Sequence, residues 1–184
     1  MNKIVQLGLS LFNAGKFSEA ATLFTRALES DGPDPRLLNF RGVSRANLGG
    51  FRESIADFTQ ALELDPQFAE AYNNRANSFA SMGEYDPAIA DYGKALQVNS
   101  MDVRAYKNRA AVWRLRGNLK ETIADYSRAL LADPDNHEIL YRRAQAWRDQ
   151  GDLQKAEVDL RLALRLEPDS PDYRRELSAL ESKG

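Results

Sequence analysis

The sequence predicts an all-α fold built from five consecutive pairs of antiparallel helices. Glycine recurs every 34 residues along the chain, at Gly15, Gly49, Gly83, Gly117 and Gly151. An Ala-Leu pair recurs with the same period, beginning at Ala27, Ala61, Ala95, Ala129 and Ala163. Between these markers, apolar residues are spaced by three and four, as in Tyr72, Ala76 and Phe79. This spacing places them on one face of a helix.

Each 34-residue unit is expected to hold two helices with a sharp turn between them. The periodic glycine marks the end of the first helix, because glycine readily adopts the left-handed conformation that helix termini need. A proline near the end of most units, as in Asp65-Pro66, terminates the second helix because the residue before proline is pushed out of the helical region. Small residues at positions 8, 20 and 27 of the unit let the helices approach closely. The predicted repeats are residues 1–34, 35–68, 69–102, 103–136 and 137–170.

The last segment, residues 171–184, is predicted to be a capping helix, so that residues 1–184 form one domain. Tyr173, Leu177 and Leu180 are expected to cover the last helix pair. The charged residues of this segment are expected to face water; they are Arg174, Arg175, Glu176 and Glu181.

The pattern resembles the tetratricopeptide repeat (TPR) over residues 1–170, with its 34-residue period and its signature of small residues, aromatic residues and proline. Gly8, Phe24 and Pro66 illustrate the three kinds of position. The resemblance implies a right-handed superhelical solenoid of antiparallel helix pairs. It also implies that the first helices line a concave, peptide-binding groove and that the protein is a non-catalytic interaction module.

Composition agrees with a non-catalytic protein. The net charge of −2 argues against a general nucleic-acid binder, and the absence of cysteine excludes a thiolate zinc site or a cysteine nucleophile. The single histidine, His137, is interpreted as an exposed residue at a helix start. No phosphate-binding loop or nucleophile motif occurs. We therefore expect no catalytic, cofactor or metal site.

No segment is long and apolar enough to span a membrane. The uncharged stretch 4–15 could serve as the apolar part of a secretory signal, but Gln6 and Asn13 interrupt it and no cleavage site follows. The repeat explains this stretch better, and a cytoplasmic location is expected.

Arginine and aspartate recur at positions 7 and 23 of units two to five. The pairs are Arg41 and Asp57, Arg75 and Asp91, Arg109 and Asp125, and Arg143 and Asp159. In unit one both positions are leucine, Leu7 and Leu23. Since the two positions change together, we predict an ion pair between the two helices of each unit rather than a metal or acid–base site. Arg45, at a position that is apolar in the other units, has no explanation from the sequence, whereas Trp113 and Trp147 at this position are expected in the core.

The resemblance assigns positions 2, 5, 6, 9, 12 and 13 to the groove. In the first two units these positions include an apolar run that predicts a hydrophobic binding surface, made by Val5, Leu9, Phe12, Phe40 and Val43. In the last three units they are rich in asparagine and basic residues: Asn73, Asn74, Asn77, Arg104, Lys107, Asn108, Arg114, Arg142 and Arg148. An amide both donates and accepts hydrogen bonds, so asparagine can hold a peptide backbone whatever its side chains.

Co-chaperone members of the family hold acidic C-terminal tails with a carboxylate clamp of five residues. Asn77, Asn108 and Arg142 match that clamp, whereas Asn73 and Glu138 stand where it has lysines. The match is partial, because Glu138 would repel a carboxylate.

The leading hypothesis is therefore a scaffold that binds a protein or peptide carrying apolar and acidic residues. One alternative is a co-chaperone-like binder with a degraded clamp. Another is a structural repeat domain that self-associates through its N-terminal repeats or is a fragment of a larger protein. RNA binding has less support, because the groove lacks the aromatic residues that stack on bases, and catalysis has the least.

Overall fold

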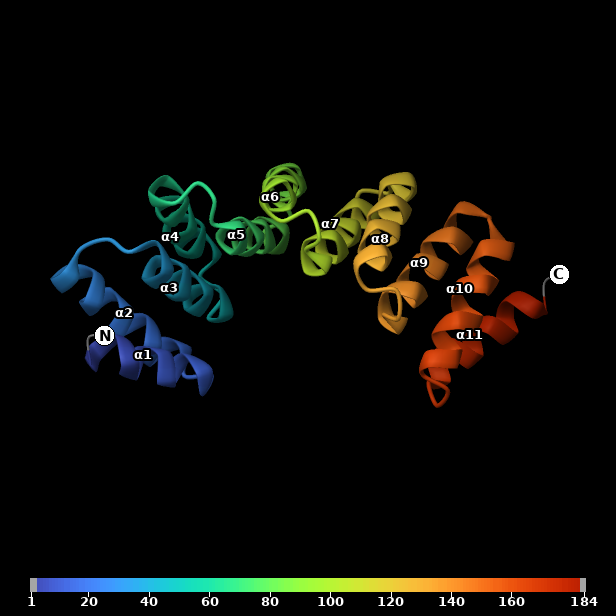
Figure 1. The fold of residues 1–184 in the computed structure, drawn as a ribbon, viewed down its shortest axis with the longest axis horizontal. Coiled ribbons are helices and arrows are strands. Elements are labelled where there is room, and N and C mark those ends of the chain that lie inside the picture. Colours follow the sequence, from blue (N-terminus) through green and yellow to red (C-terminus); the bar gives the residue numbers. More distant parts are fainter. Residues whose placement is uncertain (1–2, 183–184) are drawn as a thin grey trace. The chain divides into compact units, whose positions relative to one another are not determined.

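The computed structural model describes residues 3–182, which form eleven α-helices and no β-strand (Figure 1). The helices fall into two compact units, an N-terminal unit of residues 1–100 and a C-terminal unit of residues 101–184. The N-terminal unit holds α1 (Lys3–Asn13), α2 (Phe17–Asp31), α3 (Pro35–Asn47), α4 (Phe51–Leu64), α5 (Ala69–Ser81) and α6 (Tyr85–Val98). The C-terminal unit holds α7 (Val103–Leu115), α8 (Leu119–Ala132), α9 (His137–Gln150), α10 (Leu153–Leu166) and α11 (Pro171–Glu181).

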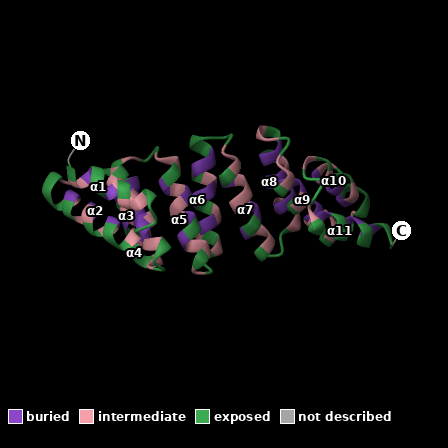
Figure 2. Ribbon diagram, turned by 90° about the horizontal axis from the view of Figure 1, so that it is seen from below, coloured by how far each residue is buried: buried purple, intermediate pink, exposed green. Residues whose placement is uncertain are grey.

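The helices pack as consecutive pairs, and this confirms the predicted all-α array of five repeats with a capping helix. Each odd-numbered helix from α1 to α9 packs against the helix that follows it. Within each unit, the second helix of one pair also packs against the first helix of the next, as α2 does against α3 and α8 against α9. The buried residues accordingly lie between neighbouring helices (Figure 2).

The periodic glycines form the turns inside the repeats, as predicted. All five have a positive φ, between 73° and 93°. At Gly49, the backbone N–H bonds to the carbonyl of Ala46, and the N–H of Gly50 bonds to that of Arg45. These two bonds satisfy carbonyls at the end of α3 that have no partner within the helix.

The predicted ends of the second helices are also found. Helix α4 ends at Leu64, directly before Asp65-Pro66, and α10 ends at Leu166, before Glu167-Pro168. Among residues 3–182, three first helices begin at a side-chain cap: α3 at Asp34, α7 at Asp102 and α9 at Asn136. Asp34 Oδ1, for example, accepts the N–H groups of Arg36 and Leu37.

All four predicted Arg–Asp pairs are present and link the two helices of their repeats. The N···O distances are 2.6 Å for Arg41–Asp57 and Arg75–Asp91, and 2.7 Å for Arg109–Asp125 and Arg143–Asp159. The aspartates are buried, so each charge is compensated by its partner as burial requires.

Three of these arginines also reach back to the preceding repeat. Arg75 Nη1 donates to Thr59 Oγ1 at 2.9 Å, and Arg143 Nη1 donates to Ser127 Oγ at 3.0 Å. Arg41 makes the equivalent bond to Thr25 at 3.4 Å. One side chain therefore joins three helices.

The structure explains Arg45. Its Nη1 lies 2.8 Å from Asp57 Oδ2, so Asp57 holds both Arg41 and Arg45. An apolar residue at position 45 would make no such contact.

The capping helix α11 covers the last pair with Tyr173, Leu177 and Leu180, all buried as predicted. The prediction that Glu176 faces water is wrong, because its side chain is only 12% exposed and receives hydrogen bonds from Arg148 and Gln145.

The prediction for His137 is half right. It opens α9, but it is only partly exposed, since its Nδ1 lies 2.9 Å from the hydroxyl of Tyr173. Trp113 and Trp147 are partly rather than fully buried. Trp147 packs against the core cluster that contains Leu177, and Lys155 Nζ lies 4.3 Å from the centre of its ring.

Candidate binding surface

The first helices of the N-terminal unit, α1, α3 and α5, carry two pockets on the positions where the sequence predicts a groove. Phe40 and Val43, one turn apart on α3, each line one of them. We call them the N-terminal pocket and the asparagine pocket.

The N-terminal pocket, of about 430 Å³, combines an apolar wall with charged residues from the end of α2, the α2–α3 loop and the start of α3. It is lined by Val5, Leu9, Asp31, Gly32, Pro33, Asp34, Arg36, Leu37 and Phe40. Of the predicted apolar residues, Val5, Leu9 and Phe40 therefore lie together.

Phe12 has a different environment. Its ring contacts Phe40 edge to face at a centroid distance of 5.2 Å, and it also meets Phe17 and Phe24. Phe24 stacks on Phe40 at 5.7 Å. This aromatic cluster holds the Phe40 ring in place, so Phe12 supports the wall of the pocket.

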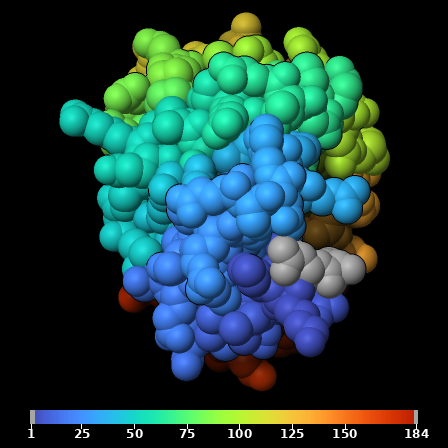
Figure 3. Space-filling model, turned by 90° about the vertical axis from the view of Figure 1, so that its left-hand side faces the viewer, coloured from blue at the N-terminus to red at the C-terminus, as the bar shows by residue number. Residues whose placement is uncertain are grey.

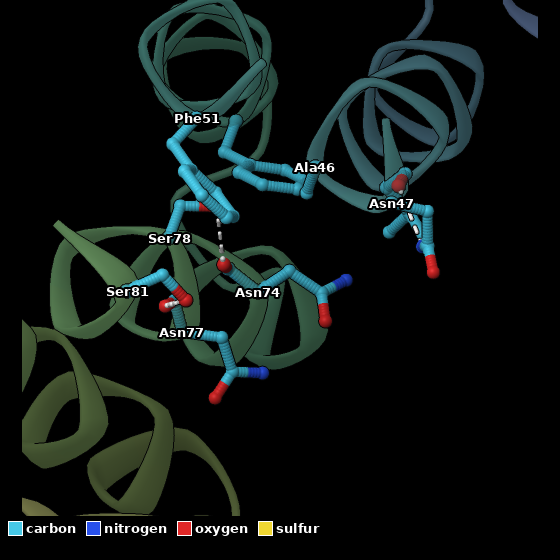
Figure 4. Close-up of a pocket in the computed structure, with 9 residues that line it drawn as sticks. Ala46, Asn47, Phe51, Asn74, Asn77, Ser78 and Ser81 are labelled. Carbon is cyan, nitrogen blue, oxygen red and sulfur yellow. Dashed lines mark hydrogen bonds between the residues drawn. The ribbon is translucent and has the colours of Figure 1, made fainter. Parts of the chain in front are cut away.

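The asparagine pocket, of about 220 Å³, lies between the second halves of α3 and α5 (Figure 4). Its lining is Val43, Ala46, Asn47, Phe51, Phe58, Asn74, Asn77, Ser78 and Ser81. It brings together the predicted residues Val43, Asn74 and Asn77.

Internal hydrogen bonds orient the amides of this pocket. The hydroxyl of Tyr92 donates to Asn77 Oδ1 at 2.5 Å, which turns the Nδ2 group of Asn77 away from Tyr92. Asn74 Nδ2 donates to Asn39 Oδ1 at 2.9 Å. Burial raises the pKa of the Tyr92 phenol, so it stays protonated and able to donate.

Asn73 does not contribute to this surface as expected. Asn73 is only 1% exposed. Asn39 and Val5, which stand at the same position 5 of the two preceding repeats, are 2% and 9% exposed. Position 5 is buried here, so the amide of Asn73 does not face solvent.

The basic residues of the C-terminal unit are largely paired with the protein's own carboxylates. Lys107 Nζ lies 3.2 Å from Glu138, and Arg142 lies 3.9 Å from the same carboxylate. Glu138, which would repel the carboxylate of an acidic tail, is therefore already paired with two of the predicted basic residues, Lys107 and Arg142.

Asp149 has a similar role on the same helix. It accepts hydrogen bonds from Arg114 at 2.7 Å and from Arg148 at 2.8 Å. Burial alone would raise the pKa of Asp149, but these two hydrogen bonds bring it below its ordinary value. The hydrogen bond from Arg148 to Asp149 in turn raises the pKa of Arg148.

Arg104 is exposed and makes no ion pair within residues 3–182, and Asn108 is partly buried.

Four residues of the asparagine pocket and its surroundings were not predicted from the sequence: Asn47, Ser81, Phe51 and Tyr92, which orients Asn77. Asn47 and Ser81 stand at position 13, a groove position, so the repeat register could have found them. The hydrogen bond from Tyr92 to Asn77 crosses between helices and leaves no mark in the sequence pattern.

No group of three or more metal-binding side chains gathers among residues 3–182. None of the helices in this range is long and apolar enough to cross a membrane. The cytoplasmic location stays a prediction.

The paired helices and their exposed first-helix surface define the chain as an α-helical repeat protein of the interaction class. Three protein-family models match the chain. Two are described as tetratricopeptide repeat: one matches residues 69–102, and the other matches residues 5–49 and 117–171. The third, described as TPR repeat, matches residues 42–83. The chain belongs to the tetratricopeptide repeat family, whose members are generally non-catalytic scaffolds for protein–protein interaction.

Solved structures with the same fold are many. MamA is 21% identical with a TM-score of 0.83, and the match covers 91% of this chain and 96% of that one. TTC0263, a thermophilic TPR protein of Thermus thermophilus, is 22% identical, with a TM-score of 0.70 and 96% of each chain covered. YrrB, described as a TPR protein with an unusual peptide-binding site, is 16% identical with a TM-score of 0.77, covering 94% of this chain and 89% of that one. No curated protein matches the chain.

Proposed function

We propose that this scaffold binds an extended peptide segment of a partner protein across α1, α3 and α5. The observation that carries the proposal is the pair of pockets on successive turns of α3, one with an apolar wall and one with amides in its lining. YrrB, which has a peptide-binding site, shares the fold and supports the proposal.

The N-terminal pocket would hold an apolar side chain of the peptide. Phe40 in its wall is held by the aromatic cluster around Phe12, so little entropy of that ring would be lost when the wall is covered. Apolar anchors of this kind set the residence time of a complex.

The asparagine pocket would hold the backbone next to that anchor. Asn77 presents its Nδ2 side to a peptide carbonyl because Tyr92 fixes its Oδ1, and Asn74 presents Oδ1 to a peptide N–H. In the C-terminal unit, Asn108 would make the equivalent contact.

Acidic groups of the partner would bind to the C-terminal unit. Five basic side chains there outnumber the three carboxylates that contact them, Glu138, Asp149 and Glu176. Arg104 would be the first contact, since it has no ion pair of its own in the described part of the chain, with Lys107, Arg114, Arg142 and Arg148 beside carboxylates that a stronger anion could displace. Charge would mainly accelerate association.

Selection of peptides from a random display library on the immobilised chain, followed by anisotropy titration, tests the proposal. Leu9→Ser and Asn77→Ala should each weaken binding of a selected peptide about tenfold or more, since each removes a contact worth roughly 1.4 kcal/mol or more. Thr22→Ala, an exposed change on α2, is the matched control. If no peptide is selected, or if the pocket variants bind like the control, the proposed function is wrong.

The acidic preference is tested separately. Arg104→Glu should weaken a selected acidic peptide and flatten its salt dependence, whereas Lys120→Glu, an exposed change in the first turn of α8, should not. Equal effects of the two variants would remove the acidic preference and leave peptide binding by the N-terminal unit intact.

A second candidate function is self-association through α1. Leu7 of α1 is 54% exposed. Helices α1 (dark blue) and α2 (medium blue) face the viewer in Figure 3. Light scattering should then detect a concentration-dependent dimer that Leu7→Ser abolishes; a monomer at all concentrations would exclude it.

A further inference from the structure

The asparagine pocket is rich in hydrogen-bond acceptors. Asn47 Nδ2 donates to the carbonyl of Val43 at 2.8 Å, and Asn74 Nδ2 donates to Asn39 Oδ1 at 2.9 Å. Both amides thus use Nδ2 within the protein and leave Oδ1 for a ligand; Figure 4 shows the two amide groups among the pocket residues. Within residues 3–182, neither oxygen accepts a hydrogen bond. Ser81 donates its hydroxyl to the carbonyl of Asn77, so its lone pairs also remain as acceptors.

A hydrogen-bonded chain ending in a carboxylate strengthens one of these acceptors. Asn74 donates to Asn39, and Asn39 Nδ2 donates to Glu70 Oε1 at 3.4 Å. All donors in this chain point toward Glu70, so the amides polarise one another and Asn74 Oδ1 becomes more negative. An approaching positive group would gain from that polarisation.

The rest of the lining suits a flat cation. None of the nine lining residues is charged, so no cation in the lining repels it. The ring of Phe51 is partly exposed beside the amides and can attract a cation over its face.

We propose that this pocket binds the guanidinium group of an arginine in the partner peptide; the inference rests on the proposed function. Guanidinium is planar and carries five N–H donors, which suits the separate acceptors of Asn47, Asn74 and Ser81. An ammonium group has three donors on one point and no flat face to stack. A carboxylate would meet oxygen atoms and is disfavoured. The partner therefore carries an arginine at the N-terminal unit, in contrast to the acidic groups expected at the C-terminal unit.

The first experiment isolates the pocket from the rest of the peptide. Isotope-labelled protein is titrated at low salt with N-acetyl-arginine N-methylamide, and the side-chain amide resonances of Asn47 and Asn74 are followed by NMR. The citrulline analogue has the same backbone and length but a neutral urea group. Arginine should shift both resonances and bind about tenfold more tightly, because hydrogen bonds to a charged group are stronger than neutral ones. Equal binding of the two compounds would show that the pocket does not recognise the guanidinium charge and would overturn the inference.

A negative charge placed at the acceptors separates a guanidinium from a neutral ligand. Asn47→Asp should tighten arginine binding several-fold and leave binding of the citrulline analogue nearly unchanged, and it keeps the protein folded because Asn47 is exposed. Asn74→Asp should act in the same direction, but it also removes the donor to Asn39 Oδ1. Gln6→Glu, an exposed change on α1 outside the pocket, controls for general attraction. A loss of arginine affinity in a folded Asn47→Asp variant would overturn the inference.

The display experiment separates this inference from the proposed function. Selected peptides should contain an arginine whose replacement by citrulline weakens binding about tenfold. Peptides selected without arginine would overturn the arginine pocket and support the proposed function. A failure to select any peptide would overturn the proposed function. The NMR titration with the arginine compound would then be the test of whether the pocket binds guanidinium.

Discussion

Gly42 on α3 stands directly over the ring of Phe58 on α4: a Cβ atom at residue 42 would lie 2.6 Å from Cε1 of Phe58. The same contact occurs in the first repeat, where a Cβ at Gly8 would lie 2.9 Å from Cε1 of Phe24. Repeats three to five have alanine at this position, opposite Tyr92, Tyr126 and Leu160. The glycines thus make room for phenylalanine rings.

Gly42→Ala should destabilise the protein, because the Phe58 ring must move from its packed position at a cost of about 1–3 kcal/mol. The 2.6 Å approach places this cost in the upper part of the range, so a net loss of about 1–2 kcal/mol remains after the roughly 1 kcal/mol that alanine gains over glycine in a helix. Urea denaturation followed by circular dichroism measures the change. Adding Phe58→Leu should recover part of it, since Ala144 stands opposite Leu160 in the last repeat. An unchanged or higher stability of Gly42→Ala would contradict the packing argument.

Removing one partner of the Arg75–Asp91 pair should cost about 3–5 kcal/mol, because it leaves a buried charge without compensation. Replacing both by leucine copies Leu7 and Leu23 of the first repeat and should cost much less than the two single changes together. A double-mutant cycle by chemical denaturation gives the coupling energy. A coupling energy near zero would remove the pairing as a source of stability.

Arg45→Leu should cost less than about 1 kcal/mol, because the Arg45 side chain is 31% exposed and such pairs contribute little. Arg41→Leu should cost more, since Arg41 is 14% exposed, holds Asp57 with two nitrogens and also reaches Thr25. The midpoints of thermal unfolding rank the two variants. The reverse order would mean that Arg45 is the main partner of Asp57.

The stability contributed by Asp149 should fall in acid. Its pKa in the folded protein is below the ordinary value, so the unfolded chain takes up the proton first. The contribution is complete above the unfolded pKa of about 3.9 and is lost as the pH falls through the folded value. Thermal melts between neutral pH and about pH 3 should therefore show a smaller acid loss for Asp149→Asn than for the unmodified protein. Glu63→Gln, which removes a carboxylate without an ion pair in the described chain, should lose stability in acid as the unmodified protein does.

The period of 34 residues was enough to predict the helices, their turns and the buried ion pairs. Glycine and proline act through backbone conformation, which is local, and Arg41 and Asp57 were recognisable because the pair recurs and both members are absent from the first repeat. The arrangement of Val5, Leu9 and Phe40 around one pocket followed from the same register.

The charged part of the surface was not predictable in the same way. Arg148 looked available in the sequence, but Asp149 and Glu176 bind it. Glu176 comes from the capping helix, which has no place in the repeat register, so its contact with α9 could not be inferred from periodicity. Asn73 was wrongly predicted to face the groove. Position 5 of the repeat is buried in the N-terminal unit, whereas in the C-terminal unit Lys107 at the same position is only partly buried, and the sequence does not reveal this difference.

The bonds from Arg75 to Thr59 and from Arg143 to Ser127 have a thermodynamic consequence. Each arginine is held by an aspartate in its own repeat and by a hydroxyl in the repeat before it. When one repeat frays, its neighbour therefore loses a partner for a charge that stays buried. In a one-dimensional array this is a nearest-neighbour coupling term, and it makes adjacent repeats within a unit melt together rather than one at a time.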